Sequence, residues 1–386
     1  MGFNVKNLNK IKNLIEDRTT LLGAGPMSKF SIDAIIELSN FYNKPIAMIP
    51  SRRQIECKEL GGGYVEHWST QSLVEYVRAK DSAGNVLLAR DHCGPWQLEQ
   101  TNLDGSHKSL SVEMDEVKIS LRVDIESGFD IIHLDPSLGT RFGYSKQEVR
   151  EILYELMTFC ESIKASELLY EVGTEEQNYS SFYETEVELQ LVLEGLKLRN
   201  LPMPTFFVLQ TGTKVVETRN VGSFDNPLDS KGILPTSFNL PRLVNLCNSN
   251  GVWLKSHNCD YMSNEALSWH PRFGIHASNV APEFGFVETK ALVELAKKIS
   301  AQDLIEIFTS EVSSRGKWKK WLLQGGQPTD YEKLLIAGHY HFSEEWHKNL
   351  RSELSLRLES IDINLNDYIY NIVKNAINRY LINFGY

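Results

Sequence analysis

Residues 130–137 read DIIHLDPS, and residues 145–162 read SKQEVREILYELMTFCES. The first stretch is a short apolar run that closes on polar residues, which is typical of a buried parallel strand. The second has apolar residues at helical spacing, and it opens with Ser145 followed three residues later by Glu148, the pattern of a helix capping box. Together the two stretches predict one strand–helix unit.

The same unit recurs along the first three quarters of the chain. Seven further apolar runs of strand length end in small or polar residues: 21–26, 45–51, 86–92, 167–175, 205–212, 252–257 and 272–279. Most of them precede a stretch with helical spacing, and such alternation predicts a parallel sheet. Eight units favour a closed (β/α)8 TIM barrel. An open α/β sheet is the alternative, although no glycine-rich nucleotide-binding motif follows the first run.

The pattern changes after about residue 300. Residues 303–310, 331–337, 343–358 and 365–384 have helical spacing, and no run there has the features of a strand. We therefore predict a (β/α)8 barrel over residues 1–300 and a helical C-terminal extension over residues 301–386 that packs on the barrel.

Charge and cysteine content narrow the classes of partner and compartment. The formal net charge is −10, which argues against nucleic acid or an anionic membrane as the main partner. The five cysteines show no C-x-x-C spacing, as expected for reduced thiols. The first residues have no apolar segment followed by a small-residue cleavage site, so we expect no leader peptide, and no run approaches the ~18 apolar residues of a membrane span. We predict a cytoplasmic protein, and we also expect a homo-oligomer.

Polar residues concentrate at the ends of six successive predicted strands. They are Asp91 and His92, His133 and Asp135, Glu171 and Glu175, Gln210, Lys255 and His257, and His276 and Asn279. The active site of a (β/α)8 barrel lies at the carboxyl ends of its strands. A single one of these residues fits a structural role equally well, but packing alone does not explain six such strand ends in succession.

The residue types suit a divalent cation and carbonyl chemistry. His92, His257 and Glu175 would give three protein ligands and leave a position open for a substrate oxygen, and zinc is the predicted ion. Such an ion polarises a sugar carbonyl and stabilises an enediolate. Asp91, next to a ligand, is placed to transfer protons.

Lys255 supports a rival chemistry. It lies two residues before His257, so both side chains should face the barrel interior. A desolvated lysine there can form a Schiff base with a ketose. The alternative is an ordinary cation that neutralises Glu171 or Asp135.

Several short motifs, taken in order, resemble a known family. They are Ser51-Arg-Arg-Gln54 with Gly61-Gly-Gly-Tyr64, Arg90-Asp-His-Cys-Gly-Pro95, His133-Leu-Asp135, Gly173-Thr-Glu175 and Ser256-His-Asn-Cys-Asp-Tyr261. They are similar to the D-tagatose-1,6-bisphosphate aldolase subunit usually called non-catalytic, a barrel relative of the zinc-dependent class II aldolases. The resemblance covers nearly the whole chain, including the tail around Gly338-His-Tyr-His341.

The resemblance implies roles for individual residues. Asp91 corresponds to the catalytic aspartate of class II aldolases, His92 and His257 to metal ligands, and Asn279 lies near an asparagine that touches substrate. Two features differ from the catalytic aldolases: Gln210 replaces a zinc-binding histidine, and the glycine-rich phosphate cradle expected after His257 is missing. We also expect Gln54, Asp135, Gln210 and Asp260 to contact the substrate.

Arg53 is a further difference, because the family usually has a neutral residue there, before a shared glutamine that is Gln54 in this chain. Arginine suits a carboxylate or phosphate, so we predict that Arg53 binds an anionic sugar, although a surface role is equally compatible with the sequence. In the tail, His339, His341 and His347 fit structural roles better than metal binding.

Three functional classes stay open. The first is a metal-dependent sugar aldolase, or an epimerase that cleaves and re-forms the same bond. The second is a non-catalytic subunit that stabilises a class II aldolase partner. The third is a sugar-binding sensory protein. Bringing polar groups together in the interior has a desolvation cost, and a protein that is only a scaffold has no reason to bear it. The converging polar residues therefore favour the enzyme.

Overall fold

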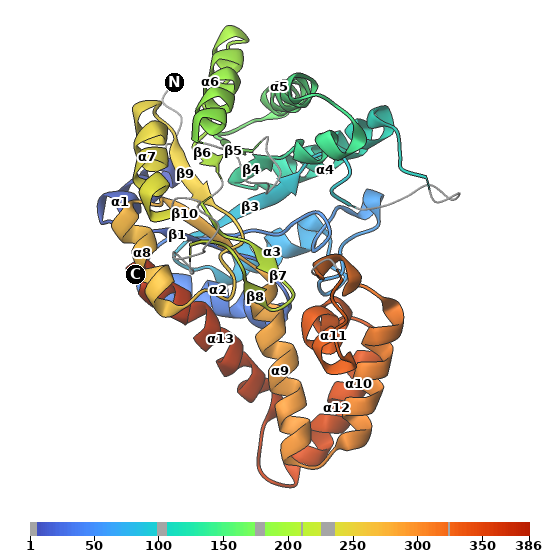
Figure 1. Cartoon of the computed structure of the whole chain (residues 1–386). Coiled ribbons are helices and arrows are strands. Elements are labelled where there is room, and N and C mark those ends of the chain that lie inside the picture. The colour runs from blue at the N-terminus through green and yellow to red at the C-terminus, as the bar shows by residue number, and fades with distance from the viewer. Residues whose placement is uncertain (1–5, 99–105, 174–181, 210, 225–235, 323–324) are drawn as a thin grey trace.

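A closed barrel of eight parallel strands forms the centre of the protein (Figure 1). The computed structural model describes residues 6–98, 106–173, 182–209, 211–224, 236–322 and 325–386. Around the barrel the strand order is β1-β10-β9-β6-β5-β4-β3-β2. The barrel strands are β1 Leu21–Ala24, β2 Ile46–Met48, β3 Val86–Cys93, β4 Ile131–Leu134, β5 Leu169–Val172, β6 Phe206–Val208, β9 Trp253–Ser256 and β10 Ala277–Val280.

Each of the eight predicted runs contributes one barrel strand, so the predicted (β/α)8 TIM barrel is confirmed. The last strand starts later than its run. The first residues of that run still belong to helix α8 (Asn264–Phe273), and Gly274 ends this helix with a φ of 77°. Glycine suits such a left-handed cap because it has no Cβ.

Helices follow most strands and cover the outside of the barrel (Figure 1). The α-helices are α1 Lys6–Glu16, α2 Lys29–Tyr42, α3 Thr70–Lys80, α4 Leu110–Ser127, α5 Lys146–Ile163, α6 Phe182–Leu198, α7 Thr236–Ser249, α8, α9 Pro282–Lys298, α10 Gln302–Arg315, α11 Asp330–Ala337, α12 Glu345–Glu359 and α13 Leu365–Phe384. Short 3-10 helices are η1 Lys58–Leu60, η2 Ser137–Phe142, η3 Lys319–Trp321 and η4 Gly338–His341. The predicted capping box of Ser145 and Glu148 begins α5.

The amino-terminal half of the barrel interior is filled with apolar side chains. Inward-facing residues of the strands, among them Leu21, Leu87, Ile131 and Phe206, form one buried cluster with Ile11 and Leu14 of α1. A second, larger cluster lies between the strands and the outer helices. Helix α1 therefore covers the bottom of the barrel, and the polar strand ends gather at the opposite rim.

A short antiparallel hairpin that was not predicted lies between β6 and α7. Its strands are β7 Val215–Val216 and β8 Arg219–Asn220. Asn220 Nδ2 donates hydrogen bonds to the backbone oxygens of Asn258 (2.9 Å) and Asp260 (3.0 Å). The hairpin thus supports the loop that follows β9, on the side of the barrel where the strands end.

The secondary-structure elements that lie in the described part of the tail are all helices, as predicted. Helices α10, α11 and α12 form a lobe beside α9, whereas α13 returns to the barrel and packs against α2, α8 and α9 (Figure 1). Tyr42 Oη donates to Asn378 Oδ1 (2.7 Å), and Thr20 N donates to Phe384 O (3.0 Å). Helix α13 therefore occupies the place in the outer ring between α8 and α2. The predicted division at residue 300 stays a prediction.

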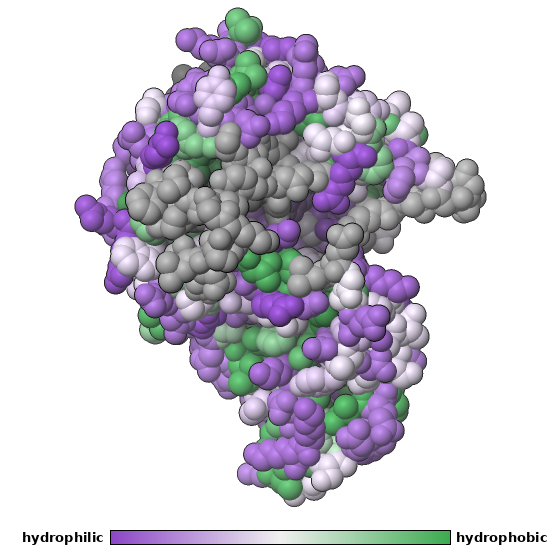
Figure 2. Space-filling model, in the orientation of Figure 1, coloured by the Kyte–Doolittle hydropathy of each residue, from purple (hydrophilic) through white to green (hydrophobic). Residues whose placement is uncertain are grey.

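None of the described helices is long and apolar enough to cross a membrane. Hydrophilic residues cover much of the described surface on the face shown in Figure 2, over the barrel as well as the lobe.

Glu288 of α9 joins the lobe to the barrel through a buried carboxyl group. Ser28 Oγ, at the start of α2, donates to Glu288 Oε2 (2.5 Å), and Arg351 Nη1 of α12 lies 3.5 Å from Glu288 Oε1. Burial raises the pKa of Glu288 to about 7, although Arg351 and Ser28 oppose the rise. The protonated form is therefore favoured in the folded protein.

We expect the Glu288→Gln substitution to stabilise the protein at pH 8 and not at pH 4. The pKa of Glu288 is higher in the folded state than in the unfolded state. The protonated carboxyl group therefore contributes its full stabilisation below about pH 4.5, and this stabilisation is lost as the pH rises through about 7. The glutamine side chain of the variant cannot ionise, so the free energy of unfolding of the variant should rise relative to wild type by about 3 kcal/mol across this window. Urea unfolding at both pH values measures the difference. The exposed Glu294→Gln on the same helix is the control, and a pH-independent difference for Glu288→Gln would contradict this account.

Candidate active site

Two adjacent residues of β3, Asp91 and His92, both contribute to the interior of the barrel rim. Successive side chains of a regular strand point to opposite faces. Here the register against β4 shifts between Arg90 and Cys93, and His92 has a φ of 48°. A bulge of this kind re-aims a side chain, so the Asp-His pair can serve one site.

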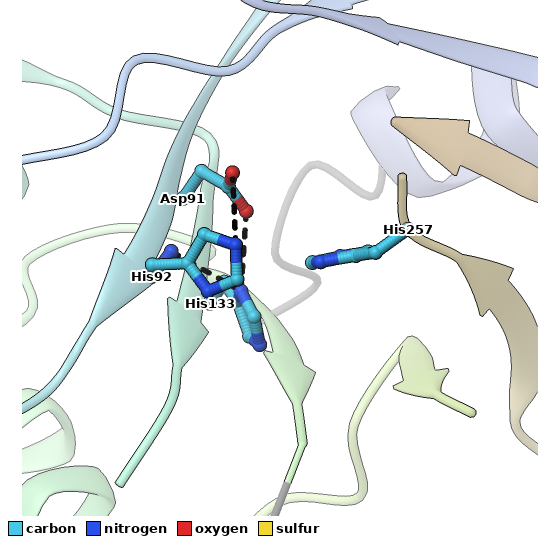
Figure 3. Close-up of side chains that lie close together, drawn as sticks. All are labelled: Asp91, His92, His133 and His257. Carbon is cyan, nitrogen blue, oxygen red and sulfur yellow. Dashed lines mark hydrogen bonds and ion pairs between the residues drawn. The ribbon is translucent and has the colours of Figure 1, made fainter. Parts of the chain in front are cut away.

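Asp91, His92, His133 and His257 converge at the carboxyl ends of β3, β4 and β9 (Figure 3). Each offers one ligand atom, and these atoms all lie within 4.8 Å of one another. We call these four residues the His/Asp cluster. His133 and His257 are buried, and Asp91 and His92 lie at the edge where the cluster is most exposed.

Two of the cluster histidines are oriented by carboxylates. His92 Nδ1 lies 2.6 Å from Asp135 Oδ2, and His257 Nε2 lies 2.8 Å from Glu171 Oε1. Each of these rings therefore has one nitrogen engaged by a carboxylate, and the Nε2 atom of His92 lies 3.6 Å from Asp91 Oδ2. Histidines that bind metal characteristically give their second nitrogen to a carboxylate.

The donor set of the cluster fits a divalent cation. Three converging imidazoles are a donor set that zinc prefers, and the Asp91 carboxylate lies beside them. The Nε2 atom of His133 is buried and has no hydrogen-bond partner among the described residues, which a bound ion would explain. No other group of three or more potential ligands was found in the described ranges. His339, His341 and His347 lie buried in the tail, outside such a group.

Electrostatics at the cluster also favour a cation. Burial alone would lower the pKa of His92, but Asp91 and the hydrogen bond with Asp135 outweigh it and raise the pKa to about 9. Burial opposes ionisation of Asp91, yet the neighbouring histidines hold its pKa well below the usual range. Positive charge is therefore stabilised between the carboxylates, and a metal ion would provide it in place of the His92 proton.

Lys255 points into the same interior and is paired with Glu171. Lys255 Nζ donates to Glu171 Oε2, and both side chains are almost fully buried. Glu171 thus connects Lys255 with His257, and His133 Nδ1 lies 3.6 Å from its other oxygen. Despite burial, the Lys255 charge and these histidines lower the pKa of Glu171. The contact of Lys255 with Glu171 is an ion pair, as in the alternative in which Lys255 neutralises a carboxylate and forms no Schiff base.

Asn279 of β10 also reaches the cluster. Its Nδ2 atom lies 3.2 Å from Asp91 Oδ1 and 3.1 Å from His257 Nε2. A Cβ atom on Gly23 of β1 would lie 2.1 Å from Asn279 Oδ1. Only glycine at position 23 leaves the Asn279 amide in this place.

Arg53 and Gln54 lie on the loop after β2. Gln54 has both ends of its amide engaged, accepting from Ser51 N (2.8 Å) and donating to Pro26 O (3.0 Å). Arg53 is half-buried. Its positive charge lowers the pKa of His92 and so opposes the rise described above. The same charge opposes the rise that burial causes in the pKa of Tyr64. The guanidinium is therefore within electrostatic range of the cluster.

The remaining predicted site residues have different surroundings. Asp135 receives hydrogen bonds from Gln97 Nε2 (2.9 Å) and Ser137 N (3.1 Å) in addition to its contact with His92. Asp260 Oδ1 accepts from the backbone of Ala281 and Glu283, both at 2.9 Å. Glu175 and Gln210 lie outside the described residues. The substrate and ligand roles of these four residues stay predictions.

The fold is shared with solved structures of low sequence identity. No protein-family model and no curated protein matches the chain. A probable tagatose 6-phosphate kinase from Sinorhizobium meliloti 1021 superposes with a TM-score of 0.75 at 14% identity, covering 94% of this chain and 100% of that one. A fructose-bisphosphate aldolase from Campylobacter jejuni gives a TM-score of 0.50 at 13% identity, over 95% of each chain. The chain thus shares its TIM-barrel fold with these two proteins.

Two residues now placed in the site were not assigned to it from sequence. His133 is a cluster member, and Glu171 bridges Lys255 and His257. A signal for His133 was present, because it lies two residues before Asp135 and so shares its strand face. Glu171 was harder to choose, because Glu175 lies four residues later in the same run and strand alternation predicts both side chains on the same face.

Proposed function

We propose that the chain is a divalent-metal-dependent carbon–carbon lyase, or a retro-aldol epimerase, that acts on an anionic sugar. The observation that carries this proposal is the convergence of Asp91, His92, His133 and His257 at the carboxyl rim of a barrel. Orienting carboxylates on His92 and His257 support the same conclusion, since histidines that bind metal usually have such a partner on their other nitrogen. We propose zinc as the ion and the cytoplasm as the compartment.

The residues present divide into ligands and a proton carrier. His92 and His257 would hold the ion with His133 beside them, and Glu175 stays the predicted carboxylate ligand. A divalent ion bound there would supply Lewis-acid polarisation of a substrate carbonyl. The Asp91 carboxylate, which lies next to His92 in the cluster, would accept the proton of a sugar hydroxyl when the adjacent C–C bond breaks. Return of the fragment by its opposite face would give an epimer.

Lys255 acts in this proposal through charge and not as a nucleophile. An amine must be neutral and free to attack a carbonyl, and Lys255 Nζ donates to the Glu171 carboxylate instead. The pair holds Glu171 in place, and Glu171 in turn orients His257. Borohydride treatment in the presence of a ketose tests this point, and no covalent adduct on Lys255 is expected.

The proposed substrate is a ketose phosphate or a sugar acid. The motifs described above resemble tagatose-bisphosphate aldolase subunits, and the two similar barrels have names that refer to tagatose 6-phosphate and fructose bisphosphate. The glycine-rich phosphate cradle is missing after His257. Arg53, within electrostatic range of the cluster, is the proposed contact for the anionic group.

We expect Arg53→Met to weaken binding of an anionic substrate by about one to two powers of ten. The loss corresponds to a charge-assisted hydrogen bond of ~1.5–3 kcal/mol, and the methionine keeps part of the apolar stem. Calorimetric titration measures it. A neutral analogue should bind wild type and variant equally, and Arg199→Met, at the surface just after α6, should bind both ligands normally. Equal weakening for charged and neutral ligands would show that Arg53 only supports its loop.

A substrate screen tests the proposed function. Purified protein with zinc is incubated with ketose phosphates and sugar acids, and the formation of a shorter aldehyde or of an epimer is followed by NMR. We expect metal-dependent turnover of at least one compound. Turnover that appears only after addition of a class II aldolase catalytic subunit would establish the non-catalytic subunit as the correct alternative. Absence of turnover under both conditions would leave no support for either enzyme role.

A further inference from the structure

The loop that follows β9 begins with the cluster residue His257 and has a strained backbone. Asn258 and Tyr261 have φ values of 57° and 59°, in the left-handed region that residues other than glycine rarely adopt. Such a conformation persists only where surrounding contacts determine it. The loop is also tied to the site, since Cys259 N donates to Asn279 O (3.0 Å).

Contacts from α9 hold the loop from one side. Asp260 accepts from the backbone N–H groups of Ala281, the N-cap residue of α9, and of Glu283 in the first turn of that helix. Glu283 in turn accepts from Tyr261 N. Asp260 and Glu283 are both buried, with 2% and 7% of their surface exposed. Burial, together with the neighbouring Glu283 charge, raises the pKa of Asp260 to about 8. A buried carboxylate such as Glu283, next to a second carboxyl group, needs a compensating charge.

Helix α13 supplies that charge and a second tether. Arg379 Nη1 donates to Glu283 Oε1 (2.9 Å), and its other guanidinium nitrogens reach Met262 O and Asn264 Oδ1. The neighbouring Tyr380 donates to Glu283 Oε2, and its Oη lies 3.3 Å from Cys259 O. Within the described part of the chain, Arg379 is the cation that forms an ion pair with Glu283.

We propose that Arg379 and Tyr380 are positioning residues, which hold the loop at residues 257–261 so that His257 stays in register with the His/Asp cluster. The inference rests on the proposed function for its link to metal binding. According to this proposal, α13 lies more than one hundred residues after the loop in the chain but determines the position of a metal-binding residue, in addition to packing on the barrel. Removing Arg379 would leave Glu283 buried without its counter-charge, and the strained loop would relax away from the cluster.

Two measurements on the full-length protein test this inference. Amide hydrogen exchange of residues 257–261 reports the loop whether or not metal binds. Zinc affinity, from competition with a chelator, and the visible spectrum of the cobalt-substituted protein report His257. The variants are Arg379→Met, Arg379→Lys and Tyr380→Phe. The control is Arg357→Met, because Arg357 of α12 pairs with Asp303 and Glu353 away from the loop.

We expect Arg379→Met to accelerate exchange in the loop and to weaken zinc about 10- to 100-fold, as loss of outer-shell partners does, with a shifted cobalt spectrum. Arg379→Lys should recover most of the affinity, Tyr380→Phe should show the same changes in smaller measure, and Arg357→Met none. If Arg379→Met does not fold, Arg379→Lys and Tyr380→Phe decide. Wild-type exchange and affinity in the folded variants would overturn the inference. A wild type that binds no zinc would instead overturn the proposed function, and loop exchange would still decide the positioning role.

Discussion

Purified wild-type protein should carry about one divalent ion per chain, and His92→Ala or His257→Ala should lose it. Each substitution removes a ligand atom from a cluster whose donors lie within 4.8 Å of one another. Loss of an outer-shell partner alone costs about 10- to 100-fold in affinity, so loss of a ligand should exceed ~100-fold. Elemental analysis after dialysis and chelator competition measure both effects.

The same prediction has a graded control. Asp135→Asn keeps the shape beside His92 Nδ1 but changes the hydrogen bond that orients the ring, so its affinity should fall between wild type and His92→Ala. His67→Ala, on a histidine that contacts the backbone of Ser343 away from the cluster, should keep the ion. Stoichiometric metal in the double variant of His92 and His257 would show that the ligands lie elsewhere.

Turnover should fall by ~10²–10⁴ in Asp91→Asn while the fold, the metal content and the Michaelis constant change little. The asparagine is nearly isosteric and can still contact His133 and Asn279, but it cannot accept a proton. That factor is the usual contribution of general acid–base catalysis. Steady-state kinetics with the substrate found by the screen measure it, and Asp330→Asn on the surface is the control.

Two results would contradict this role for Asp91. Undiminished turnover would remove the residue from the mechanism. Loss of the metal ion from Asp91→Asn would make the carboxylate a ligand, with the fall in rate a consequence of the missing ion.

The barrel was predictable because its evidence is local. Each strand is an apolar run with a polar end, and each helix shows its own period, as in residues 130–137 and 145–162. The return of α13 to the barrel was not predictable in this way. An amphipathic pattern indicates that a helix buries one face, but not which neighbours that face meets.

The site was predictable in its residue types more than in its geometry. Asp91, His92 and His257 were expected together, and the structure brings them together with His133. The bulge that lets Asp91 and His92 share one face has no signature in the period of β3. Two glutamates of residues 167–175 could contact His257. The choice between them depends on the register between strands, and side-chain alternation alone does not determine that register.

The most direct test of the account measures one rate three times on wild-type protein: as purified, after complete removal of divalent ions by a chelator, and after return of one equivalent of zinc. The substrate is the ketose phosphate or sugar acid found by the screen, and products are followed by NMR. We predict turnover in the first sample, its loss in the second and its recovery in the third. Equal turnover in all three samples would contradict a metal-dependent carbonyl site at Asp91, His92, His133 and His257.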